Sequence, residues 1–264
     1  MDIALESSEY LRLLDECHEE QRYQLFLEQH TRFIPREFIQ NHGIGCSLVL
    51  RKLSFGADYK SDFFYFSKST DDWNAVFIEI EKPSSQLFKD RTNVFHADFV
   101  KALQQINQWK AWFLSEQNKG SFLAMVSAIQ VPHHLAGNPT YNKYVLVFGR
   151  RSEYSENVDR RRLVKGLETD DFKIVTFDSL AEGLTGKYEV SIGSRHNQFI
   201  DILTDEITDP GLYSWVEPTQ LRVSETLYDK LKNGPRSRHF RLGTDGKNEE
   251  VFTRAARLVR VRYS

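Results

Sequence analysis

The sequence predicts a mixed α/β fold, in which helices flank a mixed sheet. Two observations support this class: apolar residues recur at helical spacing near the start and again in the middle of the chain, and short alternating or apolar runs lie between these segments. The order of the segments is a third observation, because strand runs separated by a long helical pattern need a crossover connection. With 264 residues, 40% of them hydrophobic, the chain can bury a substantial core.

Each element follows from its local pattern. The first is an amphipathic helix that a serine near its start can cap. Three strands follow, and the turn composition of residues 69–72 predicts an antiparallel hairpin between the second and third. On the long central helix, the spacing of Trp109 fits core packing better than base stacking. The predicted elements in chain order are helix 8–30, strands 46–53, 62–67 and 75–81, helix 95–117, strands 121–129 and 144–149, helix 156–167 and strand 173–177.

The sequence pattern changes after Leu184. Beyond this residue the periodicity weakens, and no chemical motif is evident. Residues 1–184 are therefore predicted to form the main domain, and residues 185–264 a C-terminal subdomain of unknown role.

Composition excludes several classes of function. The net charge of -2 means that any affinity for nucleic acid must come from a local cluster of basic residues. Two cysteines are too few for a disulfide framework, and the start of the chain lacks the pattern of a signal peptide. No apolar run approaches the roughly 20 residues that span a bilayer, so we expect a cytoplasmic protein without a membrane partner. A nucleophile elbow, a P-loop and a dinucleotide fingerprint are all missing from the sequence.

Acidic residues gather on the predicted hairpin. Asp62 opens its first strand, and Glu79 and Glu81 share one face of its second strand, whereas Ile78 and Ile80 point to the opposite layer. Two neighbouring acids repel each other unless solvent or a cation neutralises them. The pattern therefore has two readings: a solvated sheet face, or a site in which three carboxylates hold a hard cation such as Mg²⁺.

The surroundings of these acids resemble a known family. An acid that begins one strand, a close variant of acid-x-Lys on the next strand and a crossover helix are similar to the PD-(D/E)xK nuclease superfamily. More specifically, Phe-Ile-Glu-Ile-Glu-Lys-Pro at 77–83 and Ala-Leu-Gln-Gln-Ile-Asn-Gln-Trp at 102–109 look like the Shedu family of anti-phage nucleases. The resemblance covers roughly residues 16–182. Its other parts are Glu20 with residues 24–28, and residues 148–151 and 174–180.

The resemblance implies a fold and a function. It implies a restriction-endonuclease-like core in the main domain, DNA as the substrate, a role in bacterial anti-phage defence and a homo-oligomer. Asp62 and Glu79 would bind Mg²⁺ or Mn²⁺, with Glu20 as an additional acid nearby. Gln105 on the central helix would help to orient the site or its water. The expected reaction is the hydrolysis of phosphodiester bonds by an endonuclease or nickase.

The sequence departs from the family pattern at one position. Glu81 stands where lysine is expected, and Lys82 lies one place later, on the opposite face of the strand unless a bulge redirects it. Glu81 could serve as a further ligand or as a base that orients water. The substitution could equally mark lost catalysis, in which case the chain is a degenerate nuclease fold that binds nucleic acid or protein.

Basic residues offer candidate phosphate contacts. Arg150, Arg151, Arg160 and Arg161 could grip DNA, or they could lie on a solvated helix face. A second basic stretch covers residues 236–262. In a third reading the acids form a plain surface, and the protein is a structural partner.

Overall fold

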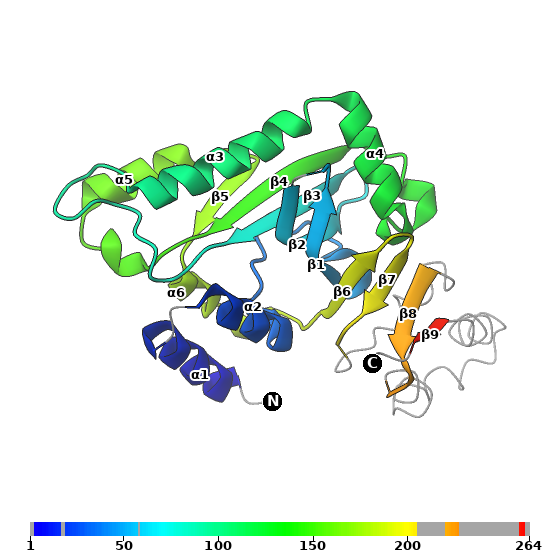
Figure 1. Ribbon diagram of the computed structural model, residues 1–264, viewed down its shortest axis with the longest axis horizontal. Helices are drawn as coiled ribbons and strands as arrows, with labels where there is room; N and C mark the ends of the chain where they lie inside the picture. Colours follow the sequence, from blue (N-terminus) through cyan, green and yellow to red (C-terminus); the bar gives the residue numbers. More distant parts are fainter. Residues whose placement is uncertain (1–2, 17–18, 58, 205–219, 227–258, 262–264) are drawn as a thin grey trace.

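The computed structural model describes residues 3–16, 19–57, 59–204, 220–226 and 259–261. Within these residues six α-helices and a nine-stranded mixed sheet confirm the predicted α/β class (Figure 1). The helices are α1 (Ile3–Glu16), α2 (Glu20–Gln29), α3 (Ala97–Trp112), α4 (Glu116–Val126), α5 (Val158–Leu167) and α6 (Phe177–Leu180). The strands are β1 (Leu48–Phe55), β2 (Tyr59–Lys68), β3 (Trp73–Ile80), β4 (Thr140–Val147), β5 (Phe172–Val175), β6 (Ser191–His196), β7 (Phe199–Ile202), β8 (Leu221–Ser224) and β9 (Val259–Val261).

The sheet runs through both predicted domains. Its order is β5-β4-β3-β2-β1-β6-β7-β8-β9, and the central strands β1, β2 and β3 pair antiparallel. The crossover through α3 makes β4 parallel to β3. Strand β6, which follows the predicted boundary at Leu184, pairs parallel with β1. The sheet is therefore continuous across that position, and the division into two domains stays a prediction.

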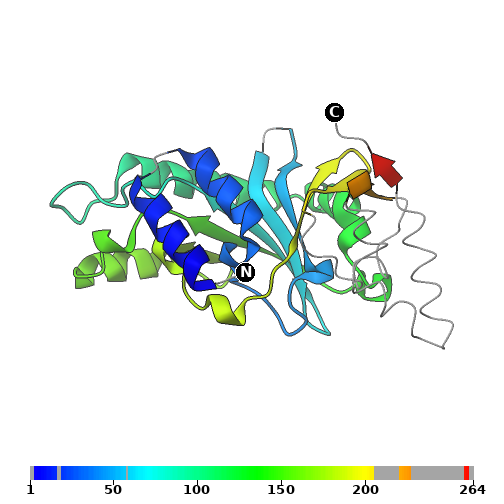
Figure 2. The same cartoon turned by 90° about the horizontal axis from the view of Figure 1, so that it is seen from below.

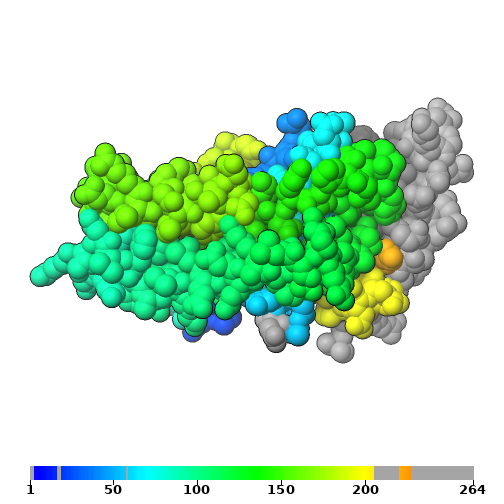
Figure 3. Space-filling model, turned by 90° about the horizontal axis from the view of Figure 1, so that it is seen from above, coloured from blue at the N-terminus to red at the C-terminus, as the bar shows by residue number. Residues whose placement is uncertain are grey.

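Helices cover both faces of the sheet. Buried side chains of α3, α4 and α5 join those of alternate strand residues in one core cluster, and those of α1, α2 and α6 form a second cluster on the other face. Figure 2 views the molecule from the side of α1 and α2. The space-filling view from above has the residues of α3, α4 and α5 over the opposite face (Figure 3). Both strand faces are buried because each is covered by helices.

An aromatic cluster fixes α3 over the central strands. Trp109 is fully buried, and its ring contacts Phe55 of β1 at 5.3 Å and Phe77 of β3 at 6.5 Å between centroids. The prediction that Trp109 packs in the core is confirmed. Gln105 lies one helical turn before Trp109, so the same packing holds Gln105 above β3.

Two predicted elements are wrong. Residues 121–129 were expected to form a strand, but α4 and a short 3₁₀ turn occupy them. The side chain of Ser115 caps α4 by accepting a hydrogen bond from the amide of Asn118, and Phe122 and Val126, four residues apart, enter the core. The single helix over residues 8–30 is instead two helices, α1 and α2. The β2–β3 hairpin is confirmed: Lys68 pairs with Trp73.

Two further observations bear on the sequence predictions. Among the residues that the structure describes, no helix is both long and apolar enough to cross a membrane. Almost all of the basic stretch at 236–262 lies outside the described residues.

Candidate functional site

The register of the hairpin brings Asp62 and Glu79 together. Phe63 on β2 pairs with Ile78 on β3, so the next position along the antiparallel ladder sets Asp62 opposite Glu79. Directly opposite residues share a face, which here is the face covered by α3, because Phe64 and Phe77 lie in the core cluster on that side. The amide of Ile80 donates a 2.8 Å hydrogen bond to Oδ2 of Asp62. Two carboxylates on neighbouring strands therefore meet at one end of the hairpin.

The carboxylate of Glu79 is largely removed from solvent. Burial raises its pKa well above the usual value, and the charge of Asp62 raises it further. Nε2 of Gln105 donates a 2.6 Å hydrogen bond to Oε1. Oε2 is buried, and none of the described residues gives it a hydrogen bond. A buried acceptor without a donor is costly, so this oxygen is suited to a ligand that carries positive charge.

Glu81 and Glu20 extend the acidic cluster beyond the end of β3. Burial raises the pKa of Glu81, and the next largest causes are the charges of Glu20 and Asp62. Glu20 belongs to the first turn of α2, where the helix dipole favours a negative charge. Lys101 on α3 acts in the opposite sense and lowers the pKa of Glu81. An acid of α2 therefore acts on an acid that follows the hairpin.

Lys82 makes no ion pair with these acids among the described residues. It follows Glu81 in an exposed position after the end of β3. The structure places a different lysine beside the acids. Nζ of Lys52, on β1, forms an ion pair with Oδ1 of Asp62.

The sequence also did not predict an ion pair next to Lys52, between Arg51 and Glu28. Nη1 of Arg51 forms a 2.7 Å ion pair with Oε2 of Glu28 on α2, and Nε2 of Gln24 donates to Oε1 of Glu28 at 3.1 Å. Burial raises the pKa of Glu28, and the charge of Asp62 also raises it. The sequence carries no signal for this ion pair, because Glu28 lies on α2 and the packing of α2 against β1 is a tertiary contact.

A family comparison covers the whole of this site. A family model described as the C-terminal part of the Shedu protein SduA matches residues 17–181. The chain belongs to the Shedu family. None of the curated proteins matches it.

The Shedu match contains Glu20, Asp62, Glu79, Glu81 and Gln105. It extends from α2 to α6 and includes every strand from β1 to β5, whereas β6 to β9 follow it. The candidate site therefore lies entirely within the part of the chain that is shared with the Shedu family.

The acids of the Shedu region offer part of a ligand set for a divalent metal. The described residues contain no group of three or more His, Cys, Asp or Glu side chains arranged to hold a metal ion. The pair Asp62 and Glu79 nevertheless fits a hard cation, because both supply carboxylate oxygens and Oε2 of Glu79 is buried without a donor. Water or a phosphate group would have to complete the coordination.

Three of the four candidate DNA-binding arginines are engaged within the fold. Nε of Arg150 contacts Oδ1 of Asp178 at 2.9 Å, and Nη1 of Arg151 contacts Oε1 of Glu182 at 2.5 Å. Arg160 donates to backbone carbonyls, and its guanidinium lies 4.7 Å from the ring centroid of Phe88. Arg161 is exposed on α5. These contacts give Arg150, Arg151 and Arg160 structural roles whether or not they also reach a phosphate.

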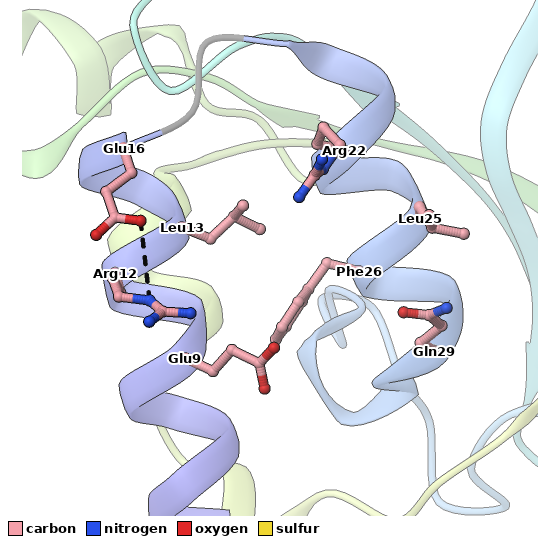
Figure 4. A pocket seen from close by; sticks show the side chains of 8 residues that line it. All are labelled: Glu9, Arg12, Leu13, Glu16, Arg22, Leu25, Phe26 and Gln29. Carbon is pink, nitrogen blue, oxygen red and sulfur yellow. Dashed lines mark ion pairs between the residues drawn. The ribbon is translucent and has the colours of Figure 1, made fainter.

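A separate cavity of about 280 Å³ lies between α1 and α2 (Figure 4). Leu13 and Phe26 point into it from the two helices, and Arg12 and Glu16 form an ion pair of 3.8 Å along α1. None of the acids of the candidate site lines this cavity.

Proposed function

We propose that the chain is a metal-dependent DNA endonuclease or nickase that hydrolyses phosphodiester bonds with Mg²⁺ or Mn²⁺ and acts in bacterial anti-phage defence. The observation that carries the proposal is the pairing of Asp62 with Glu79, whose buried Oε2 has no hydrogen-bond donor among the described residues. A buried carboxylate with a raised pKa beside a second carboxylate forms a site that a divalent cation would neutralise. Family membership supports the assignment.

Each residue of the site has a role in this reaction. Asp62 and Glu79 hold the cation, which supplies polarisation of the phosphate and activation of water. Gln105 fixes the carboxylate of Glu79 through its 2.6 Å hydrogen bond. Glu81 and Glu20 add negative charge at the mouth of the site and favour retention of the cation. The order hairpin, crossover helix and parallel strand agrees with a PD-(D/E)xK core.

One observation favours a second function. Glu81 occupies the place of the family's lysine, and a site without that charge is compatible with a fold that binds nucleic acid or a protein partner without turnover. The two functions differ in one measurable respect: only the nuclease needs a divalent metal to change the covalent structure of DNA.

Purified protein is expected to nick or linearise supercoiled plasmid with Mg²⁺ or Mn²⁺ and to leave it intact in EDTA. Agarose gels measure the conversion of supercoiled plasmid to the nicked and linear forms. A parallel reaction with linear DNA tests whether cleavage needs free DNA ends. We also propose that the chain forms a homo-oligomer, and light scattering measures its mass in solution. Intact plasmid under every metal condition, together with a gel shift, would favour the binding module.

The arginines are expected to divide into two groups. Arg161→Gln should weaken binding to any DNA sequence and reduce the slope of log K against log salt by about 1, because one phosphate contact is lost. Arg150→Gln should instead destabilise the fold by about 1–2 kcal/mol, because Asp178 and the carbonyl of Leu14 lose a donor. Salt titrations of DNA affinity and urea unfolding measure the two effects. Equal loss of affinity in both variants would contradict the division.

A further inference from the structure

The three central strands carry one charged residue each in a single row. On β1, the pairs Arg51–Phe63 and Leu53–Ser61 set Lys52 opposite Asp62, just as the β2–β3 register sets Asp62 opposite Glu79. The ion pair between Lys52 and Asp62 agrees with this register. A cation and two carboxylates therefore cross the sheet side by side.

Lys52 contributes positive charge among the acids. Besides its contact with Asp62, its charge lowers the pKa of Glu79 and that of Glu28. Lys82, by contrast, is exposed beyond the end of β3. Of these two lysines, Lys52 is therefore the one whose ammonium lies among the acids.

The backbone at Lys52 is held in an uncommon conformation. Its φ is 45°, in the left-handed region that residues with a side chain seldom adopt. Leu50 and Leu53 enter the same core cluster, although residues three apart on a regular strand point to opposite faces. The regular alternation of β1 is thus interrupted at Lys52. Such strain persists where the surrounding structure imposes it, and it concentrates at functional sites.

The ammonium of Lys52 has donors left for a ligand. A lysine carries three N–H donors, and Asp62 is the acceptor that the structure gives it within the described part of the chain. One third of its side chain is exposed (34%), whereas that of Asp62 is almost completely buried (7%). The side chain of Lys52, unlike that of Asp62, is therefore partly open to the solvent from which a phosphate would approach.

We propose that Lys52 is the catalytic lysine of this site and takes the role that Glu81 cannot fill. The proposal rests on the proposed nuclease function. In the reaction a water oxygen bonds to phosphorus and the bond from phosphorus to one ester oxygen breaks. The water loses a proton to solvent, and the leaving oxygen gains one. Lys52 keeps its own proton and donates hydrogen bonds to a non-bridging phosphate oxygen, where negative charge increases in the transition state. Asp62 holds the ammonium in position.

Lys52→Met is expected to lower the kcat of plasmid nicking about a hundredfold or more, which is the usual loss for one transition-state donor. KM should change less than threefold. The rise in melting temperature caused by Mn²⁺ should be kept or enlarged, because the carboxylates lose the ammonium that competes with the cation. Lys52→Arg retains the charge and is expected to recover at least tenfold of the lost kcat.

Controls separate a catalytic role from a structural one. Lys60→Met makes the same change at an exposed position of β2 and is expected to nick like the wild type. If Lys52→Met does not fold, Lys52→Asn replaces it, because asparagine tolerates positive φ and removes the charge. Melting in EDTA checks the fold of each variant.

Four results would overturn the proposal. Nicking by Lys52→Met within threefold of the wild type would remove Lys52 from catalysis while leaving the nuclease assignment intact. So would a loss of nicking in Lys82→Met but not in Lys52→Met. If Lys52→Met lost both nicking and the rise in melting temperature caused by Mn²⁺, Lys52 would be a structural element of the metal site. A wild type that never nicks DNA would refute the proposed function itself, and this proposal with it.

Discussion

Glu79→Gln is expected to abolish metal-dependent nicking, with a loss of at least about a hundredfold, because an electrostatic group at the centre of the site is removed. Glutamine keeps the size of the side chain and can still accept a hydrogen bond from Gln105, so the packing around β3 is retained. The neutral amide is a poor ligand for a divalent cation. Initial rates of plasmid nicking with Mn²⁺ measure the effect, and nicking at the wild-type rate would contradict the site.

The same substitution is expected to stabilise the protein in EDTA at pH 7–8. Burial and the charge of Asp62 raise the pKa of Glu79 in the folded state above its value in the unfolded chain. The folded state therefore holds this proton more tightly, and the wild type loses stability as pH rises through the interval between the two pKa values. The glutamine variant carries no such penalty. Its advantage in melting temperature should be present above this interval and should vanish below the ordinary glutamate pKa, where Glu79 is protonated in both states.

A matched control uses an acid outside the site. Glu156 is exposed before α5, so Glu156→Gln should melt like the wild type at every pH. Mn²⁺ should raise the melting temperature of the wild type and of Glu156→Gln but not that of Glu79→Gln. A pH-independent difference between Glu79→Gln and the wild type would show that Glu79 is ionised without cost in the folded state.

The acid pair could be predicted from sequence because its geometry depends on local features. Strand alternation assigns residue 79 to one face, and the turn at residues 69–72 joins the two strands that carry Asp62 and Glu79. Lys52 could not be predicted in the same way. Its strand was expected, but its register against β2 was not, and a shift of one residue would turn its side chain to the other face. The left-handed backbone conformation of Lys52 also could not be predicted, because no residue pattern in the sequence indicates a positive φ at a lysine.

The fold was predictable to the extent that periodicity is unambiguous. Strands β1 to β5 and helices α3 and α5 agree with their patterns in place and type. The run Ser-Phe-Leu-Ala-Met-Val at 121–126 does not alternate, and a short apolar run fits a buried strand as well as a buried helix. The cap at Ser115 decided for the helix. Strand β6 escaped prediction because its pairing with β1 is a long-range contact. Strand β7, which joins β6 in a local hairpin, was missed as well.

Trp109→Ala is expected to reduce the free energy of unfolding by about 3–5 kcal/mol, the range for removal of a large buried aromatic side chain. The indole is fully buried against Phe55 and Phe77, and alanine would leave a cavity between α3 and the central strands. Urea unfolding followed by circular dichroism measures the loss. Leu114→Ala, at an 83% exposed position just after α3, should change stability by less than about 0.5 kcal/mol.

This substitution also tests how the fold supports the site. Because Gln105 lies one turn before Trp109, a cavity under α3 loosens the donor that fixes Glu79. Nicking by Trp109→Ala should therefore fall even at temperatures where the variant remains folded, and DNA affinity should not change. A loss of DNA affinity without a loss of stability would instead mean that the indole stacks on bases. That result is incompatible with a side chain that is 0% exposed, because a buried ring offers no face to a base.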